Sequence, residues 1–201
     1  MPKLLYSFYQ RDDVVGLAVE LLGKQLFTFI DGKLTSGIIV ETEAYNGISD
    51  KASHAYGDRF TPRTATMYEA GGITYVYLCY GIHHLLNVVT APKGTPQAVL
   101  IRAVEPLEGV PAMLERRDMS RLAPRITAGP GSVAKAFGID KKLNAKDLLG
   151  EEIWIEDNGL KIEPSKIVAS PRVGVDYAGD HALLPWRFYV KGNPYVSKPN
   201  S

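Results

Sequence analysis

Two apolar and aromatic segments, separated by about thirty residues, constrain the fold of this chain most strongly. Residues 37–45 read GIIVETEAY, and residues 73–81 read ITYVYLCYG. β-Branched and aromatic residues favour strands, where successive side chains point to opposite faces of a sheet. The first segment ends in two carboxylates and a tyrosine, and the second ends in a Tyr-Gly turn. The chain is therefore expected to contain a sheet that presents acidic and aromatic side chains.

Turn signals predict further elements around these two segments. Asp31-Gly32 and Gly81 are each expected to join two strands into a hairpin. Strands are predicted over residues 24–29, 34–45, 74–80, 84–90, 97–105, 152–155, 167–169 and 186–190. Helices are predicted over residues 7–24 (capped by Asp12 or Asp13), 106–117 (starting at Pro106) and 133–137 (after Gly129-Pro130-Gly131). A long polar loop is expected over residues 46–70, and a loose tail over 195–201.

Strands mixed with separated helices indicate an α+β fold. We expect a curved, mostly antiparallel β-sheet flanked by helices, with a protruding β-hairpin around Gly81. The chain has 201 residues, enough to bury a sizeable core, so residues 1–201 are expected to form a single domain.

The composition is that of an ordinary globular protein, with 45% hydrophobic and 22% charged residues. The single cysteine, Cys79, excludes an internal disulfide and a multi-cysteine metal site. We find no apolar span of membrane length and no signal-peptide pattern. A cytoplasmic protein without a membrane partner is expected, associated with the nucleoid if the source is bacterial.

The net charge of +1 argues weakly against a protein that coats nucleic acid through bulk electrostatics. Residues 116–146, however, carry eight lysines and arginines against Asp118 and Asp140. This segment forms either a basic binding face or an ordinary solvated helix surface, and the sequence leaves both open.

Alternation along a strand puts Glu41, Glu43 and Tyr45 on one face. Hydrolysis of a glycosidic bond needs a carboxylate that orients and deprotonates water and stabilises the cationic sugar. Two alternatives remain open: the glutamates lie on the wet face of an edge strand, or they serve a carbohydrate hydrolase. Paired carboxylates of sugar hydrolases normally face each other from separate elements, however. Spacing does not decide between Glu41 and Glu43 as the reacting carboxylate.

The second segment places Tyr75 and Tyr77 on a common face. These rings either belong to the core or form a stacking wall for a base, since each buried hydroxyl needs a partner. Tyr80 differs because it precedes Gly81 at a hairpin tip, where an aromatic packs poorly but can wedge into a base stack. A carboxylate beside aromatic walls points to nucleic-acid base chemistry.

The histidines and glycines give no sign of a metal or cofactor. His54 follows the carboxylate strand in a polar loop and could reach the same pocket. His83 and His84 are adjacent on a strand and point to opposite faces, which does not favour joint metal ligation. The zinc-deaminase pattern and the glycine-rich phosphate loops are absent. No metal and no cofactor are expected.

Eight motifs, in order along residues 7–197, resemble the alkyladenine (3-methyladenine) DNA glycosylase family. They are ETEAY (41–45), SH (53–54), TPR (61–63), YVYLCYG (75–81), LIRAVEPLEG (100–109), GP (129–130), RVGV (172–175) and LPWRFYV (184–190). Each motif is weak alone, and the ordered set is highly specific. The long N-terminal extension of some animal members is missing.

The resemblance implies catalytic roles. Glu43 matches the general base that activates water, whereas Glu41 becomes a structural carboxylate. Arg102 and the backbone carbonyl of Val173 match groups that hold this water. Without the resemblance, Arg102 would be interpreted as a buried salt-bridge partner.

The resemblance also implies a base pocket. The flipped base stacks between Tyr45 on one side and His54 with Tyr77 on the other, and the backbone amide of His54 can read its edge. Asn87 matches a residue at the pocket floor that obstructs the amino group of guanine. Tyr80 matches the residue that wedges into the duplex through the minor groove.

Contacts with the DNA backbone are implied for Arg59 and Thr61. The chain departs from the family after Gly129-Pro130, where Gly131-Ser132 stands in place of a frequent lysine. Helix amides and Ser132 could replace that phosphate contact. The departure affects the expected affinity for DNA and not the reaction.

The resemblance therefore implies a monofunctional DNA N-glycosylase, a hydrolase of N-glycosyl bonds that acts on damaged purines in double-stranded DNA. A monomer suffices to recognise one flipped base. Two alternatives remain, a non-catalytic nucleic-acid-binding module and the carbohydrate hydrolase. The sequence does not identify the preferred lesion.

Overall fold

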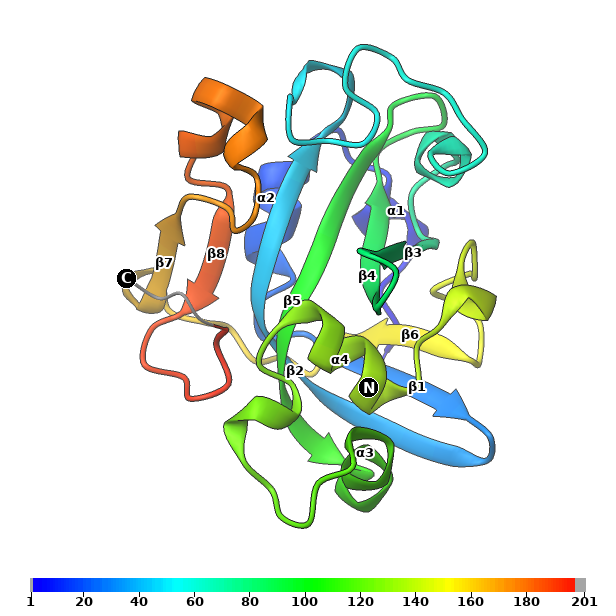
Figure 1. Ribbon diagram of the computed structural model, residues 1–201, viewed down its shortest axis with the longest axis vertical. Helices are drawn as coiled ribbons and strands as arrows, with labels where there is room; N and C mark the ends of the chain where they lie inside the picture. The colour runs from blue at the N-terminus through cyan, green and yellow to red at the C-terminus, as the bar shows by residue number, and fades with distance from the viewer. Residues whose placement is uncertain (1, 198–201) are drawn as a thin grey trace.

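A single eight-stranded sheet organises the computed structural model, which describes residues 2–197 (Figure 1). The strands are β1 Gln25–Ile30, β2 Lys33–Asn46, β3 Thr74–Cys79, β4 His83–Thr90, β5 Gln97–Glu108, β6 Ile153–Glu156, β7 Ile167–Ser170 and β8 Arg187–Val190. They run in the order β3-β4-β5-β2-β1-β6, with β8 paired to both β2 and β7. The pairings are antiparallel. The predicted α+β class is confirmed.

Strand β2 is central to the sheet because it changes partners along its length. It pairs with β5 along one side, and on the other side it pairs first with β1 and then with β8. Both faces of its C-terminal half are buried, so Glu41 and Glu43 have no exposed surface. The alternative of a wet edge strand is therefore wrong.

The predicted hairpins are confirmed at both turns. Asp31 and Gly32 adopt positive φ angles of 52° and 70° between β1 and β2. Tyr80 and Gly81 adopt 50° and 71° between β3 and β4. Such backbone suits glycine and is uncommon for tyrosine. The second turn leaves Tyr80 88% exposed at the tip of the protruding hairpin.

Helices cover the sheet on two sides (Figure 1). They are α1 Tyr6–Tyr9, α2 Val14–Glu20, α3 Val110–Arg117 and α4 Pro130–Phe137. Helix α2 packs on β2, and α4 packs on β4 and β5. Within the described chain, no helix is long and apolar enough to cross a membrane.

Two predicted helix boundaries are wrong. The helix predicted over 7–24 is two helices, because Asp13 begins a new one by accepting a hydrogen bond from the Gly16 amide. Pro106 does not start a helix but lies in β5, opposite Gly37 and beside an irregularity in the pairing. Proline is tolerated in a strand at such positions. Helix α3 begins only after Gly109, which has a φ of 71°.

The loose tail predicted over 195–201 is wrong for its first residues, and residues 198–201 lie outside the described chain. Val196 packs in an apolar cluster with Val40 and Ala103. Ser197 is 3% exposed and is hydrogen bonded to Glu41. Interactions with β2 and β5, distant in sequence, therefore order this end of the chain.

Candidate active site

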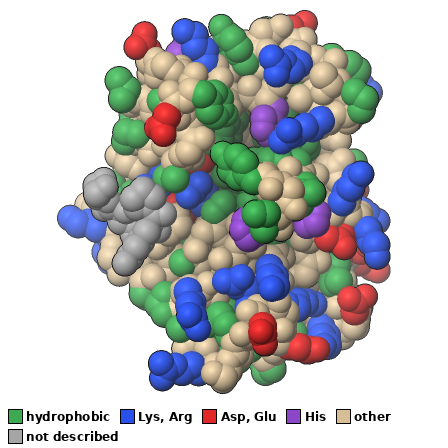
Figure 2. Space-filling model, in the orientation of Figure 1, with side chains coloured by type: hydrophobic (Ala, Val, Ile, Leu, Met, Phe, Trp, Pro, Cys, Tyr) green, Lys and Arg blue, Asp and Glu red, His purple; other side chains and the backbone are tan. Residues whose placement is uncertain are grey.

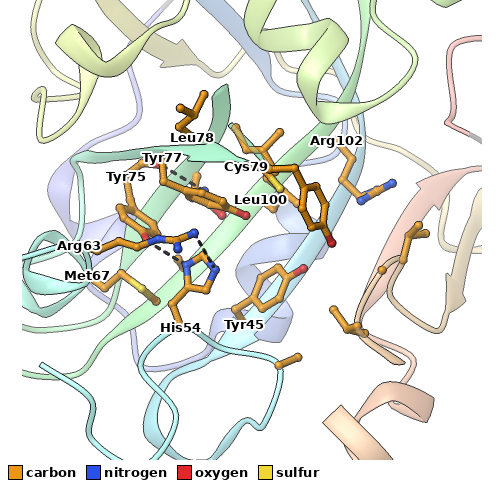
Figure 3. A pocket seen from close by; sticks show the side chains of 18 of the residues that line it. Tyr45, His54, Arg63, Met67, Tyr75, Tyr77, Leu78, Cys79, Leu100 and Arg102 are labelled. Carbon is orange, nitrogen blue, oxygen red and sulfur yellow. Dashed lines mark hydrogen bonds between the residues drawn. The ribbon is translucent and has the colours of Figure 1, made fainter. Parts of the chain in front are cut away.

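A pocket of about 350 Å³ opens between the β3–β4 hairpin, the strands β2 and β5 and two loops (Figure 3). Seven predicted site residues line it: Tyr45, His54, Tyr77, Tyr80, Asn87, Arg102 and Val173. Figure 3 shows the rings of Tyr45, His54 and Tyr77 around the same space. The sheet therefore brings together residues that lie as far apart as β2 and the segment before β8.

Glu43 lies directly behind the lining of this pocket, fully buried, with its carboxylate held by three residues that do line it. Its Oε1 accepts a hydrogen bond from the Val173 amide at 2.8 Å and pairs with Arg102 Nη1 at 3.3 Å. Its Oε2 accepts a hydrogen bond from the Tyr45 hydroxyl at 2.8 Å. Burial, followed by the charge of Glu43, raises the pKa of Tyr45 well above its ordinary value, so this hydroxyl stays protonated and donates.

A β-bulge directs Arg102 toward the carboxylates. Ala103 and Ile101 pair with the consecutive residues Glu41 and Thr42, which leaves Arg102 as the extra residue of β5. Arg102 Nε donates to Glu41 Oε1 at 2.9 Å. Burial alone would lower the pKa of Arg102, but the adjacent glutamates hold it above its ordinary value. Arg102 is thus a buried salt-bridge partner that also faces the pocket.

The wall opposite Tyr45 is aromatic, with the charged guanidinium of Arg63 beside its rings. His54 lies edge-on to Tyr77, with ring centroids 4.7 Å apart, and its Nδ1 is 2.9 Å from the Tyr75 hydroxyl. Arg63 Nη2 lies 3.4 Å from His54 Nε2. Arginine can only donate, so Nε2 accepts and Nδ1 carries the proton. Burial, with the charges of Arg63 and Arg59, lowers the pKa of His54 to about 4.

Tyr75 and Tyr77 share a face as predicted, with ring centroids 5.3 Å apart. The carbonyl of Tyr75 also accepts a hydrogen bond from the Asn87 side-chain amide at 3.1 Å. Asn87 is 4% exposed and therefore presents a fixed amide to the pocket from β4.

Besides Glu43, which is buried behind it, two predicted site residues lie outside the pocket lining, Arg59 and Thr61. Arg59 is exposed and Thr61 half-buried in the loop that precedes β3. Thr64 ties this loop together, since its hydroxyl donates to the Arg59 carbonyl and accepts from the Thr61 amide. The two residues are thus on the surface beside the pocket.

The basic segment 116–146 is partly used inside the fold. Arg116 donates to the carbonyls of Ala136 and Ile30, and Arg117 to that of Ile126. Figure 2 nevertheless shows Lys and Arg side chains gathered where α3 and α4 lie in Figure 1. The segment therefore supplies both hydrogen bonds within the fold and basic surface.

Sequence reasoning missed the ion pair of Arg172 and Asp50, which supports the side of the pocket formed by Tyr45. Arg172 donates to both carboxylate oxygens of Asp50, at 2.5 and 2.8 Å, and its guanidinium lies 4.8 Å from the Tyr45 ring centroid. Burial alone would raise the pKa of Asp50, but Arg172 holds it below its ordinary value. The pair is 122 residues apart, and no spacing rule links the two positions.

Within residues 2–197, no three His, Cys, Asp or Glu side chains gather as a metal site would require. The geometry is that of a pocket for a planar ring, with a buried carboxylate behind its lining.

Comparison with known proteins identifies the family. Residues 7–194 match the family described as Methylpurine-DNA glycosylase (MPG). A Clostridium acetobutylicum protein named "Putative 3-methyladenine DNA glycosylase" is 46% identical over 97% of each chain. Proteins of the same name from Desulfitobacterium hafniense (45% identical, 98% of this chain and 99% of the relative) and Chlamydia felis (47% identical, 92% and 94%) also match. The chain belongs to the methylpurine-DNA glycosylase family, which implies DNA N-glycosylase activity and a DNA substrate.

Proposed function

We propose that the protein excises alkylated or deaminated purines from double-stranded DNA as a monofunctional glycosylase, releasing the free base and leaving an abasic site. One observation carries this proposal: the buried Glu43 carboxylate is hydrogen bonded to Tyr45 and Val173, which line a cavity together with His54 and Tyr77. A purine that enters this cavity has its glycosidic bond near the carboxylate.

In this mechanism Glu43 is the general base. A carboxylate offers about four acceptor positions. The donors described above, Val173, Arg102 and Tyr45, occupy three of them. The remaining position on Oε2 accepts a proton from water as the bond to the sugar breaks, and the negative charge stabilises the cationic sugar. Arg102 and the Val173 carbonyl help to hold that water.

Recognition of the base depends on uncharged aromatic walls. Tyr45 stacks on one face of the flipped purine, and His54 with Tyr77 contacts the other. A protonated imidazole would repel purines made cationic by alkylation, whereas neutral rings attract them. The buried Asn87 amide obstructs the amino group of undamaged guanine.

The hairpin tip and the adjacent loop hold the DNA. Tyr80 fills the gap left by the extruded nucleotide, and Arg59 and Thr61 contact the backbone. Among the described residues, no lysine lines the pocket. The monofunctional assignment follows, because a lyase needs an amine nucleophile at the sugar.

The test is single-turnover excision from duplex oligonucleotides that carry one hypoxanthine or ethenoadenine, and from methylated genomic DNA. Release of a free base, with strand cleavage only after alkali treatment, is expected. Lesion binding without release from any substrate would favour a non-catalytic binding module. Turnover of a sugar polymer instead would favour the carbohydrate hydrolase.

A further inference from the structure

The end of the described chain enters the charge cluster behind the pocket. Ser197 is 3% exposed, and three of its polar groups bind buried charged side chains. Its amide donates to Glu41 Oε2 at 2.7 Å, and its hydroxyl donates to Glu41 Oε1 at 2.8 Å. Its carbonyl accepts a hydrogen bond from Arg187 Nη2 at 3.0 Å. These contacts fix the segment to β2 and β8 at the residues closest to Glu43.

The Ser197 hydroxyl also contacts the arginine of the pocket. Arg102 Nη2 donates to Ser197 Oγ at 3.2 Å, while Arg102 Nε donates to Glu41 at 2.9 Å. A guanidinium is planar and rigid, so two fixed nitrogens determine where the third lies. That third nitrogen, Nη1, lies 3.3 Å from Glu43 Oε1.

We propose that Ser197 is a positioning residue for catalysis, which acts through Arg102 to hold the Glu43 carboxylate in its reacting geometry. The inference rests on the proposed glycosylase function. Ser197 lies outside the pocket lining and does not contact the purine. Its effect is therefore on the chemical step and not on binding of the lesion.

The variant Ser197→Ala tests this role because it removes the hydroxyl and keeps both backbone contacts. A displaced catalytic group can cost up to about a hundredfold in rate, and we expect single-turnover excision to fall by about tenfold to a hundredfold. The Kd for lesion-containing duplex should stay unchanged.

The groups other than Arg102 that face Glu43, the Tyr45 hydroxyl, the Val173 amide and the more distant charge of Arg172, are unchanged in this variant.

Val196→Ala is the matched control, since it loosens the same segment through apolar packing alone. It should lower the unfolding temperature without a comparable loss of excision rate. A wild-type rate for Ser197→Ala would overturn the inference, as would equal rate losses in both variants. In either case, base release by the wild type would leave the proposed function standing. No release by the wild type from any lesion would instead remove the proposed function, and the inference with it.

Discussion

Glu41 and Glu43 are identical residues on the same strand, both without exposed surface, yet their surroundings differ in one decisive respect. Four hydrogen bonds reach the Glu41 carboxylate, from Arg102, from Arg187 and two from Ser197. Glu43 accepts two hydrogen bonds and forms one ion pair. All three partners of Glu43 line the pocket, whereas Arg187 and Ser197, which bind Glu41, lie outside its lining.

The comparison separates a structural carboxylate from a reactive one. Burial cannot distinguish them, and neither can the presence of an arginine, because Arg102 pairs with both. The position of the partners distinguishes Glu43, since Tyr45, Arg102 and Val173 join its carboxylate to the pocket.

Glu43→Gln should produce the largest effect. Removal of a general base costs about a hundredfold to ten-thousandfold, so excision in single-turnover assays should fall within or below that range. Binding to lesion-containing duplex should persist, because the aromatic walls remain. Excision at the wild-type rate would contradict the assignment of Glu43 as the base.

Glu41→Gln should act mainly on stability. It leaves Arg102 and Arg187 buried without their shared counter-charge, and breaking a buried pair costs about 3–5 kcal/mol. Urea unfolding should show a free energy of unfolding lowered by that amount. Glu43→Gln is the matched control and should lose less, because Arg102 keeps its bond to Glu41. Equal losses in the two variants would remove the distinction between the carboxylates.

Local sequence rules predict the hairpins around Asp31-Gly32 and Tyr80-Gly81 because the turn residues themselves determine the geometry. Such rules fail at Pro106, whose proline looks like a helix start and instead lies beside an irregularity in a long strand. The irregularity depends on how two distant strands pair. A short stretch of sequence does not show how distant strands pair.

Strand alternation predicts that Glu43 and Tyr45 lie on one face, where the structure shows them hydrogen bonded. Alternation cannot choose Glu43 over Glu41. The two carboxylates differ in their binding partners, and Ser197, which binds Glu41, lies 156 residues away along the chain. The choice came from the family resemblance. The roles of Arg59 and Thr61 also depend on it, because the pocket geometry alone does not include them.

The burial of His54 in the aromatic wall of the pocket predicts a pH dependence of stability. The pKa of His54 lies at about 4, below its ordinary value of 6.5. As the pH falls between these values the unfolded chain binds a proton that the folded protein does not, so stability decreases. His54 is partly exposed, and its contribution should be about 1–3 kcal/mol.

Urea unfolding at pH 7, 5.5 and 4.5 measures this contribution when wild type is compared with His54→Phe. The variant should lose less stability on acidification, although its carboxylates still titrate. Parallel curves for the two proteins would show that His54 titrates normally in the folded state.

The smallest effect is expected at the hairpin tip, where Tyr80 lines the pocket but lies outside the charged cluster. At 88% exposure its ring contributes little to packing, so Tyr80→Ala should leave the unfolding temperature unchanged. A ring that stacks against a base contributes about 1–3 kcal/mol, so excision of a well-paired lesion should fall by about tenfold.

The loss of excision in Tyr80→Ala should shrink for a mismatched lesion, because its nucleotide leaves the stack more easily. Ile82→Ala is the control, since Ile82 is 72% exposed on the same turn. If this control lost as much activity, the effect would belong to apolar surface on the hairpin in general and not to a tyrosine wedge. A loss confined to Tyr80 would instead separate extrusion of the nucleotide, at the tip, from the chemistry at Glu43.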